Sequence, residues 1–187
     1  MEKPRLIIGI SGSSGVIYGI RLLQLLQPLP VETHLVVSKA AFLACNHESS
    51  MRATELKSLA TVYHAHNNIA APIASGSFKT MGMIIAPCSM KSLAEIAHGI
   101  GGNLLARAAD VVLKERRRLV LMTRETPLHL GHLQNMVSVT QMGGIIFPPV
   151  PAFYNDPQTI MDIVNDSVAR VLDLFDLGNN LVRRWGE

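Results

Sequence analysis

Residues 8–26 read IGISGSSGVIYGIRLLQLL, an apolar run that passes into glycine and serine and then into a segment of helical period. Glycine lets the chain turn sharply after a strand, and the following helix presents free N–H groups and a positive dipole end. Strand, glycine-rich turn and helix in this order predict a phosphate or flavin site at residues 11–15. The simpler alternative is a plain strand-to-helix turn in which Ser14 caps the helix.

A nicotinamide cofactor fits this loop poorly. A dinucleotide site places an acidic residue about 20 residues further on, at the end of the second strand, to bind the ribose hydroxyls. Here the second apolar run ends in Val36, Val37 and Ser38, which offers a hydroxyl in place of a carboxylate. The pattern favours another phosphate-bearing ligand.

The rest of the chain alternates between strand-length apolar runs and segments of helical period. We expect strands at 6–10, 34–37, 83–86, 119–123 and 145–148, and helices at 16–26, 39–45, 54–64, 92–100, 104–116, 132–142 and 160–174. This alternation predicts one domain over residues 1–187, an α/β fold with a parallel sheet covered by helices on both faces. Ligands of such sheets bind beyond the carboxyl ends of the strands. The long irregular stretch 65–79 is predicted to be a functional loop.

Composition excludes several classes of protein. Lysine and arginine exceed aspartate and glutamate by 17 to 14, and aromatic residues make up 5% of the chain, which argues against a nucleic-acid partner. Charged residues make up 17%, below the usual quarter, so we expect other subunits to cover part of the surface. The N-terminal apolar run is too short for a signal peptide or membrane span, and two cysteines suit a reducing cytosol. We expect a cytoplasmic protein with no membrane contact.

The third strand runs into APCSMK, residues 86–91. We expect Pro87 to end the strand, so that Cys88 and Ser89 begin the next helix and contact a flavin or an anion. Cys88 could be a nucleophile, because a helix N-terminus lowers a thiol pKa. No histidine base accompanies it locally, which favours a small packing or ligand-contact residue.

The fourth strand ends at Arg124 and Glu125. The pair is either a salt bridge or an arginine that grips an anion beside a carboxylate that carries a proton. His129 and His132, three residues apart, offer too few ligands for a metal and are interpreted as capping or interface residues, as are His64 and His66.

A basic run, KERRR, occupies residues 114–118 and is interpreted as a solvated helix end, with Lys114 as the exception. Arg107 lies two helical turns before Lys114, so both could bind one phosphate. Tyr154 and Arg170 follow further along the chain, and neither residue alone indicates a binding site.

Taken in order, eight motifs span nearly the whole chain: GISGSSGVIYGIRLL, VSKAA, ASGSF, PCSMKSL, ARAADVVLKERR, RETPLHLGH, PPVPAFYNDPQ and RWGE. Together they resemble the UbiX-type flavin prenyltransferases, including relatives known as phenylacrylic acid decarboxylases. The resemblance implies the Rossmann-like, flavodoxin-type fold of the flavin-dependent cysteine decarboxylase superfamily. Those decarboxylases carry a histidine after the first helix and a proline–methionine–asparagine motif, where this chain has SKAA and PCS.

The family reaction transfers a dimethylallyl group, without a metal, from dimethylallyl monophosphate to N5 and C6 of reduced FMN. Its product, prenylated FMN, serves a separate UbiD-type decarboxylase, and family members form dodecamers with sites at subunit junctions. By motif, the implied FMN contacts are Ser11, Gly12, Ser13, Ser38, Cys88, Ser89, Met90, Lys91 and Arg124. The implied prenyl-phosphate contacts are Ser75, Gly76, Arg107, Lys114, Tyr154 and Arg170. The implied residues that handle protons and charge are Ser14, Glu48 and Glu125.

Two alternatives remain. An FMN-dependent decarboxylase acting directly on an aromatic acid would share the fold, and a non-enzymatic flavin carrier would share the first loop. The decarboxylase needs an acid–base residue that this chain lacks at the matching positions. The carrier needs no second phosphate site.

Overall fold

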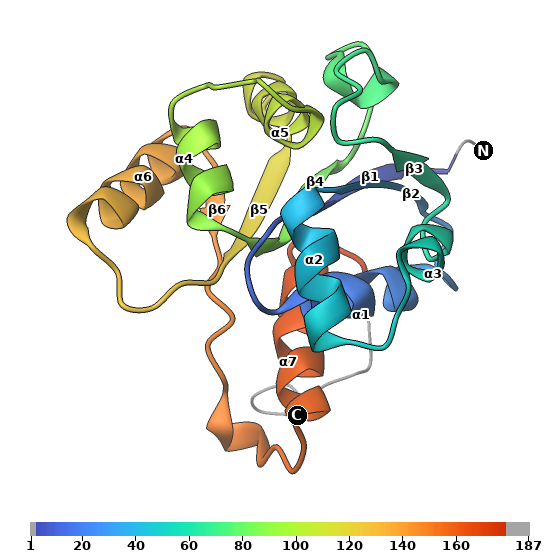
Figure 1. The fold of residues 1–187 in the computed structure, drawn as a ribbon, viewed down its shortest axis with the longest axis vertical. Helices are drawn as coiled ribbons and strands as arrows, with labels where there is room; N and C mark the ends of the chain where they lie inside the picture. Colours follow the sequence, from blue (N-terminus) through green and yellow to red (C-terminus); the bar gives the residue numbers. More distant parts are fainter. Residues whose placement is uncertain (1–2, 179–187) are drawn as a thin grey trace.

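The computed structural model describes residues 3–178, so the motif RWGE lies outside the described residues. Its centre is a six-stranded sheet in the order β3-β2-β1-β4-β5-β6, with every neighbouring pair parallel (Figure 1). This is the doubly wound order of Rossmann-like sheets. The strands are β1 Arg5–Ile10, β2 Glu32–Val37, β3 Val62–His64, β4 Gly82–Cys88, β5 Arg118–Thr123 and β6 Ile145–Ile146.

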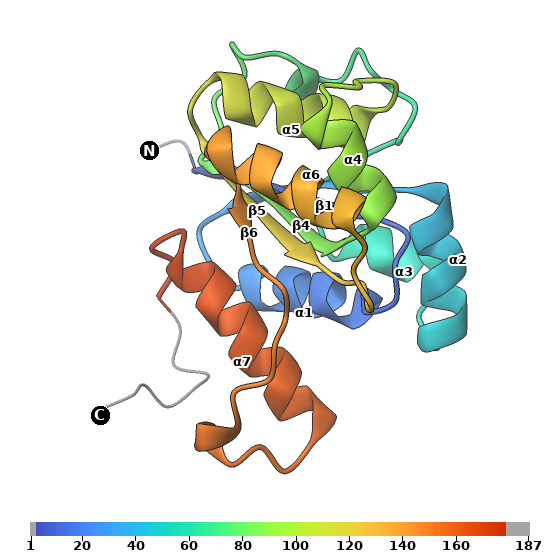
Figure 2. The ribbon, with the colours of Figure 1, turned by 90° about the vertical axis from the view of Figure 1, so that its left-hand side faces the viewer.

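Helices cover both faces of the sheet, as predicted (Figure 2). On one face lie α1 (Val16–Leu26), α2 (Lys39–Glu48), α3 (Ala53–Ser58) and α7 (Ile160–Asp173). On the other face lie α4 (Met90–Ala97), α5 (Leu104–Lys114) and α6 (Leu130–Gln141). Two short 3-10 helices, η1 (Pro72–Ala74) and η2 (Phe153–Asn155), belong to the connecting loops. The predicted α/β class is confirmed.

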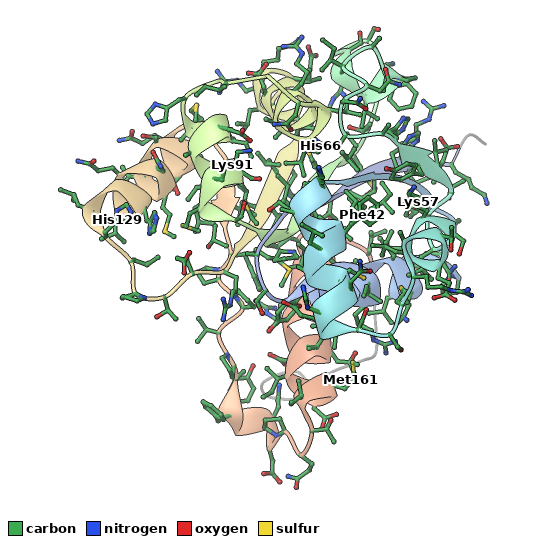
Figure 3. The ribbon with its side chains drawn as sticks, viewed as in Figure 1. Phe42, Lys57, His66, Lys91, His129 and Met161 are labelled. Atoms are coloured by element: carbon green, nitrogen blue, oxygen red, sulfur yellow. The ribbon has the colours of Figure 1, made fainter. Side chains whose placement is uncertain are left out.

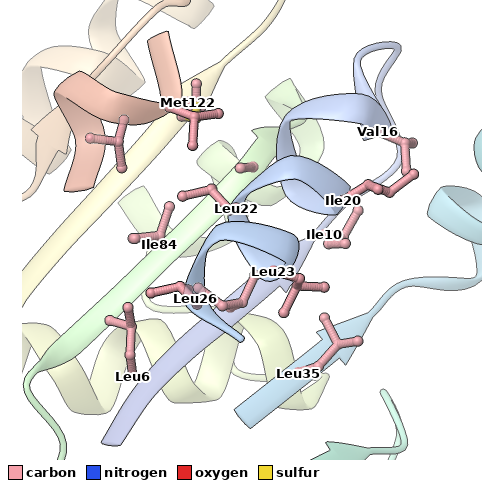
Figure 4. Packing of buried hydrophobic residues seen from close by; sticks show 14 of the residues in the cluster. Leu6, Ile10, Val16, Ile20, Leu22, Leu23, Leu26, Leu35, Ile84 and Met122 are labelled. Atoms are coloured by element: carbon pink, nitrogen blue, oxygen red, sulfur yellow. The ribbon is translucent and has the colours of Figure 1, made fainter. Parts of the chain in front are cut away.

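Both faces of the central strands are buried, which explains their continuous apolar sequence. Leu6 and Ile10 of β1 belong to one core together with Ile20, Leu22 and Leu26 of α1 (Figure 4), whereas Ile7 packs into the second core on the other face. Each such side chain, fully buried, stabilises the fold by about 1.5–3 kcal/mol. Gly19 lets α1 approach β4, because a Cβ there would overlap the Ala86 carbonyl oxygen.

One predicted element is wrong. The single helix expected at 54–64 is a short helix followed by a strand, because α3 ends at Ser58 and β3 begins at Val62. The exchange of hydrogen bonds between Thr33 and Thr61 aligns β3 with β2: Thr33 Oγ1 accepts from Thr61 N at 2.9 Å, and Thr61 Oγ1 accepts from Thr33 N at 3.2 Å. Pairing with β2 therefore overrides the helical pattern of the local sequence.

Two strand ends also differ from expectation. Pro87 does not end β4, which continues to Cys88 through a register shift between Ile85 and Cys88. A bulge of this kind accommodates a residue that has no N–H to donate. Strand β6 has two residues, Ile145 and Ile146, where four were expected, because the chain pairs with β5 only there.

The direction in which successive strands are added to the sheet reverses between β1 and β4. From β1 the sheet grows through β2 to β3, and from β4 it grows through β5 to β6. The crevice at this switch point, at the carboxyl ends of the strands, is the usual ligand site of such folds. Between residues 3 and 178 there is also no helix with the length and apolar character needed to cross a bilayer.

Candidate functional site

A cavity of about 620 Å³ opens at the switch point. Loops after β1, β2, β4 and β5 form its walls, with one residue from the loop after β3. Its volume is typical of a site for a small ligand. Its lining consists of Gly12, Ser13, Ser14, Ser38, Lys39, Ala40, Leu43, His66, Ser89, Met90, Lys91, Ser92, Glu95, Asn103, Arg124 and Glu125.

Two serines at helix N-termini face this cavity. Ser38 caps α2 by accepting a hydrogen bond from Ala41 N at 3.1 Å, and Ser89 caps α4 by accepting from Ser92 N at 3.2 Å. The positive ends of both helix dipoles therefore point into the cavity. Because the Ser38 oxygen is the acceptor in its cap, its hydroxyl hydrogen can still be donated to a ligand.

The first loop also has the features of a ligand cradle. Ser13 Oγ is buried and has no hydrogen-bond partner among the described residues, which is costly unless a ligand supplies one. A side chain at Gly12 would overlap Ala40 of α2, so only glycine lets the two loops meet here. Both features fit an anion at this loop.

The N-terminus of α1 is already occupied. The Glu48 carboxylate accepts hydrogen bonds from Gly15 N at 2.8 Å and from Val16 N at 3.1 Å. Gly15, with φ of 103°, is the N-cap residue, so the alternative of Ser14 as the cap is wrong. The first N–H groups of α1 are thus already hydrogen-bonded within the chain, which leaves Gly12 and Ser13 as the part of the loop open to a ligand.

Two expected flavin contacts lie behind the cavity wall. Ser11 is fully buried and braces β1 against β4, since its hydroxyl donates to Pro87 O at 3.0 Å and accepts from Ser89 N at 2.7 Å. Cys88 is fully buried in the second core, and burial raises the pKa of its thiol far above the usual range. Burial therefore argues against a thiolate nucleophile at Cys88 and fits the small packing residue that was one of the two favoured interpretations.

Charged side chains line the mouth of the cavity. Lys91 Nζ lies 3.7 Å from Glu95 Oε1, and Asn103 Nδ2 donates to Glu95 Oε2 at 3.1 Å. His66 lies in the loop after β3 and Lys91 on α4 (Figure 3). Burial lowers the pKa of His66, with Glu95 raising it and Lys91 lowering it by smaller amounts.

Arg124 and Glu125 do not form an ion pair with each other in the structure. Glu125 accepts a hydrogen bond from Thr126 N at 3.0 Å, and both side chains line the cavity. Arg124 also acts on Tyr18: burial raises the pKa of the Tyr18 phenol, and the nearby guanidinium partly offsets this. The arrangement favours the anion-gripping interpretation of Arg124 over a salt bridge.

A second group of predicted residues gathers at the end of α5. Gly76 lies against the Lys114 ammonium and the Glu115 carboxylate, because a Cβ at Gly76 would lie 2.8 Å from Lys114 Nζ and would overlap Glu115. Lys114 and Glu115 form an ion pair, which lowers the pKa of Glu115. Ser75 precedes Gly76 in this loop and exchanges a hydrogen bond of 2.9 Å with Ser77.

The remaining predicted phosphate contacts are divided between the layers. Arg107 lies on α5 and pairs with Asp110 at 2.8 Å. Tyr154 belongs to η2, and Arg170 lies on α7, where it pairs with Asp173 at 3.3 Å. Helices α5 and α7 cover opposite faces of the sheet (Figure 2), so one chain alone does not bring the whole set together.

Comparison with known proteins settles the family. A family model described as "Flavoprotein" matches residues 1–177. The flavin prenyltransferase UbiX of Neisseria meningitidis serogroup B is 60% identical over 181 residues, which cover 97% of this chain and 96% of that protein. The chain belongs to the UbiX flavin prenyltransferase family.

Solved structures of the UbiX family share the fold nearly throughout. AnUbiX, in complex with FMN and dimethylallyl pyrophosphate, has a TM-score of 0.97 and 48% identity, covering 99% of this chain and 98% of that one. A dodecameric FMN-dependent UbiX-like decarboxylase from Escherichia coli O157:H7 has a TM-score of 0.96 and 50% identity, covering 98% and 100%.

Several cavity residues of this family member escaped the sequence analysis. Glu95 stands four residues after Lys91 on one helix, and this i,i+4 spacing was the available signal. Asn103 comes from a loop without a periodic pattern, and His66, interpreted from the sequence as a capping or interface residue, lines the cavity, so only the tertiary structure places both here. The interpretation of His129 as a cap is confirmed, because its Nδ1 accepts from Gly131 N at 3.1 Å. His64 is instead a buried strand residue paired with His34.

Proposed function

We propose that this chain transfers a dimethylallyl group from dimethylallyl monophosphate to N5 and C6 of reduced FMN, with inorganic phosphate as the second product. The single observation that carries the proposal is the cavity at the switch point, built from the motifs that this chain shares with the flavin prenyltransferases at 60% identity. The relative AnUbiX, described with FMN and dimethylallyl pyrophosphate, supports the choice of both reactants.

The residues of the cavity fit FMN. An unpartnered buried hydroxyl at Ser13, the bare backbone of Gly12 and the cap of α2 at Ser38 provide donors for its phosphate and ribityl groups. Ser89, Met90, Lys91 and Arg124 border the remainder of the cavity. Reduced FMN supplies electron-rich N5 and C6 atoms, which receive the dimethylallyl group.

The prenyl phosphate binds at the second group of residues in this proposal. Ser75, Gly76 and Lys114 supply a hydroxyl, a backbone approach and a cation from one region of the chain. When the allylic C–O bond breaks, the departing phosphate gains charge, and fixed donors at Lys114, Arg107, Tyr154 and Arg170 stabilise it. Exclusion of water then favours capture by the flavin over hydrolysis.

A second copy of the chain completes the site. Tyr154 and Arg170 stand on the layer opposite Lys114, so they reach a shared phosphate only from a neighbouring subunit. Exposed apolar side chains on α6 and near η2 provide surface for such contacts. They are Leu130, Leu133, Val137, Val150, Phe153 and Ile160. The dodecameric relative supports the same assembly for this chain.

Three side chains handle protons and charge in the proposal. Glu125 lines the cavity and exchanges a proton with the reacting groups, and Ser14, which lines the same cavity, supplies a hydroxyl donor. Glu48 holds the N-terminus of α1 and so places the first loop. In the proposal its negative charge favours the developing allyl cation. The product, prenylated FMN, is passed to a UbiD-type decarboxylase in the cytosol, a setting that suits the unpaired thiols of Cys45 and Cys88.

Mass spectrometry of the flavin tests this function. The protein is incubated without oxygen with reduced FMN and dimethylallyl monophosphate, and the extracted flavin should gain the mass of one C5H8 unit. Release of carbon dioxide from an aromatic acid by the chain with unmodified FMN would favour the decarboxylase instead. If the flavin is unchanged and no carbon dioxide is released, the result would favour the non-enzymatic flavin carrier.

A further inference from the structure

Arg117 does not behave as part of a solvated helix end. Its side chain is 15% exposed, whereas that of its neighbour Arg118 is 43% exposed and lies near Asp176. The guanidinium donates from Nη1 to Phe78 O at 2.8 Å and from Nη2 to Gly76 O at 2.7 Å. Arg117 therefore clamps two carbonyls of the loop that carries Ser75 and Gly76.

The clamped loop is also held from its other side. The Phe78 ring lies under the Arg5 guanidinium, 4.6 Å from ring centroid to Cζ, and meets the His34 ring edge-on at 5.2 Å between centroids. Phe78 N donates to Ser75 O at 3.2 Å, which closes the turn. The ring anchors one end of the turn, and Arg117 fixes the backbone between that anchor and the proposed phosphate contacts.

The clamp sets the position of Gly76 relative to Lys114. Gly76 lies so close to Lys114 and Glu115 that a methyl group in place of its hydrogen would displace one of them. Glu115 Oε2 lies 3.9 Å from Arg117 Nη2, and the same carboxylate pairs with Lys114. Arg117 thus contacts both the loop backbone and the counter-ion of Lys114, the two neighbours between which the proposed phosphate contacts lie.

We propose that Arg117 is a positioning residue for the prenyl donor: it holds the 76–78 backbone at the distance from Lys114 that a phosphate group requires. The inference rests on the proposed function of this site. A planar guanidinium with several N–H donors spans two carbonyls, whereas a lysine ammonium is a point charge on a flexible stem. The positioning role of Arg117 therefore depends on the planar shape of its guanidinium as well as on its charge.

Two variants separate shape from charge, with a matched control. Arg117→Met removes charge and donors, Arg117→Lys keeps the charge, and Arg118→Met removes the neighbouring charge at the first residue of β5. Each protein is loaded with reduced FMN, and the rate of flavin prenylation in a single turnover is measured against dimethylallyl monophosphate concentration. FMN affinity and amide hydrogen exchange of residues 75–78 are measured alongside.

We expect both Arg117 variants to raise the half-saturating donor concentration by about tenfold or more, with a smaller effect on the plateau rate. Amide hydrogen exchange at residues 75–78 should be faster in both variants, while their FMN affinity should equal that of the wild type. The Arg118→Met protein should match the wild type in all of these measurements. Two results would overturn the proposed clamp. One is an Arg117→Lys protein whose half-saturating donor concentration equals that of the wild type, and the other is an Arg117→Met protein whose half-saturating donor concentration lies within about twofold of it. Should Arg117→Met fail to bind FMN, Arg117→Lys decides alone. A wild-type protein that forms no prenylated flavin defeats the proposed function, and exchange at 75–78 then still tests the clamp.

Discussion

His34 Nδ1 and His64 Nε2 lie 2.9 Å apart on neighbouring strands, with both rings buried beneath the loop that carries Phe78. His34 Nε2 lies 2.8 Å from Glu32 Oε1. Because a carboxylate only accepts, the neutral His34 carries its proton on Nε2, and its Nδ1 accepts from His64. Protonation of both rings would turn this contact into two facing donors.

Acid should therefore weaken the fold. Burial lowers the pKa of both His34 and His64. The pKa of Glu32 is also lowered, mainly by its hydrogen bond with His34 and to a smaller extent by the Arg5 guanidinium. The folded state favours neutral histidines, so their stabilising contribution is complete above the unfolded pKa of about 6.5 and is lost as pH falls below it. The melting temperature should drop between pH 7.5 and pH 5.5.

Substitution at His64 tests the origin of that drop. His64→Gln keeps an N–H donor toward His34 without a titrating group, so the melting temperature should vary less with pH. His98→Gln, at an exposed position on the C-cap of α4, is the control and should keep the wild-type slope. Equal slopes in all three proteins would show that the pair does not set acid stability.

Ser11 and Ser13 should differ in their effects, although they are two residues apart. Ser11→Ala leaves the Ser89 N–H without its acceptor and should lower the free energy of unfolding by about 1–3 kcal/mol. Ser13→Ala removes a hydroxyl with no partner within the described chain, so it should leave stability unchanged and weaken FMN binding by about tenfold. Calorimetry and flavin fluorescence titration measure the two effects. A Ser13→Ala protein with full FMN affinity would place the flavin phosphate elsewhere.

Lys114→Ala should slow prenyl transfer far more than it weakens FMN binding. Loss of one donor to a developing negative charge raises a reaction barrier by about 2.7–4 kcal/mol, and Lys114 lies outside the flavin cavity. Single-turnover rates and FMN titration give the two numbers. Lys57→Gln, which removes a charge from α3, is the control (Figure 3). Parallel loss of both properties would contradict the assignment of Lys114 to the prenyl phosphate.

Glu125→Gln should retain FMN but alter the pH dependence of the transfer rate. The amide keeps the size of the side chain and can still accept from Thr126 N, while it no longer exchanges a proton. Asp176→Asn, a charge-matched change at a 92% exposed side chain, should leave the profile as in the wild type. A Glu125→Gln protein with the wild-type rate at every pH would remove Glu125 from proton transfer.

Local sequence was sufficient where one segment makes its own structure. The run at residues 8–26 specifies a strand, a turn and a helix because apolar period and glycine placement act over neighbouring residues. It also placed the cavity, since the carboxyl ends of parallel strands meet at one edge of a sheet. The same local rule failed at 54–64, where hydrogen bonds to Thr33 on another strand favour β3 over a longer helix.

The pattern of charged residues along the sequence was less informative about function, because the role of a charged side chain depends on the residues it contacts in the fold. Arg116, Arg117 and Arg118 are equivalent in sequence, yet only Arg117 bonds to the loop carbonyls, since the turn before β5 directs it toward Gly76 and Phe78. Likewise, nothing near Glu48 in the sequence points to the N-terminus of α1, more than thirty residues away. The sequence by itself determined the alternating elements, the sheet class and the glycine- and serine-rich loop that lines the cavity, because each follows from residues a few positions apart. The tertiary structure alone decided which hydroxyls face the cavity, which arginine holds the 76–78 backbone and which predicted residues lie on opposite faces of the sheet, because those contacts join segments that only folding brings together.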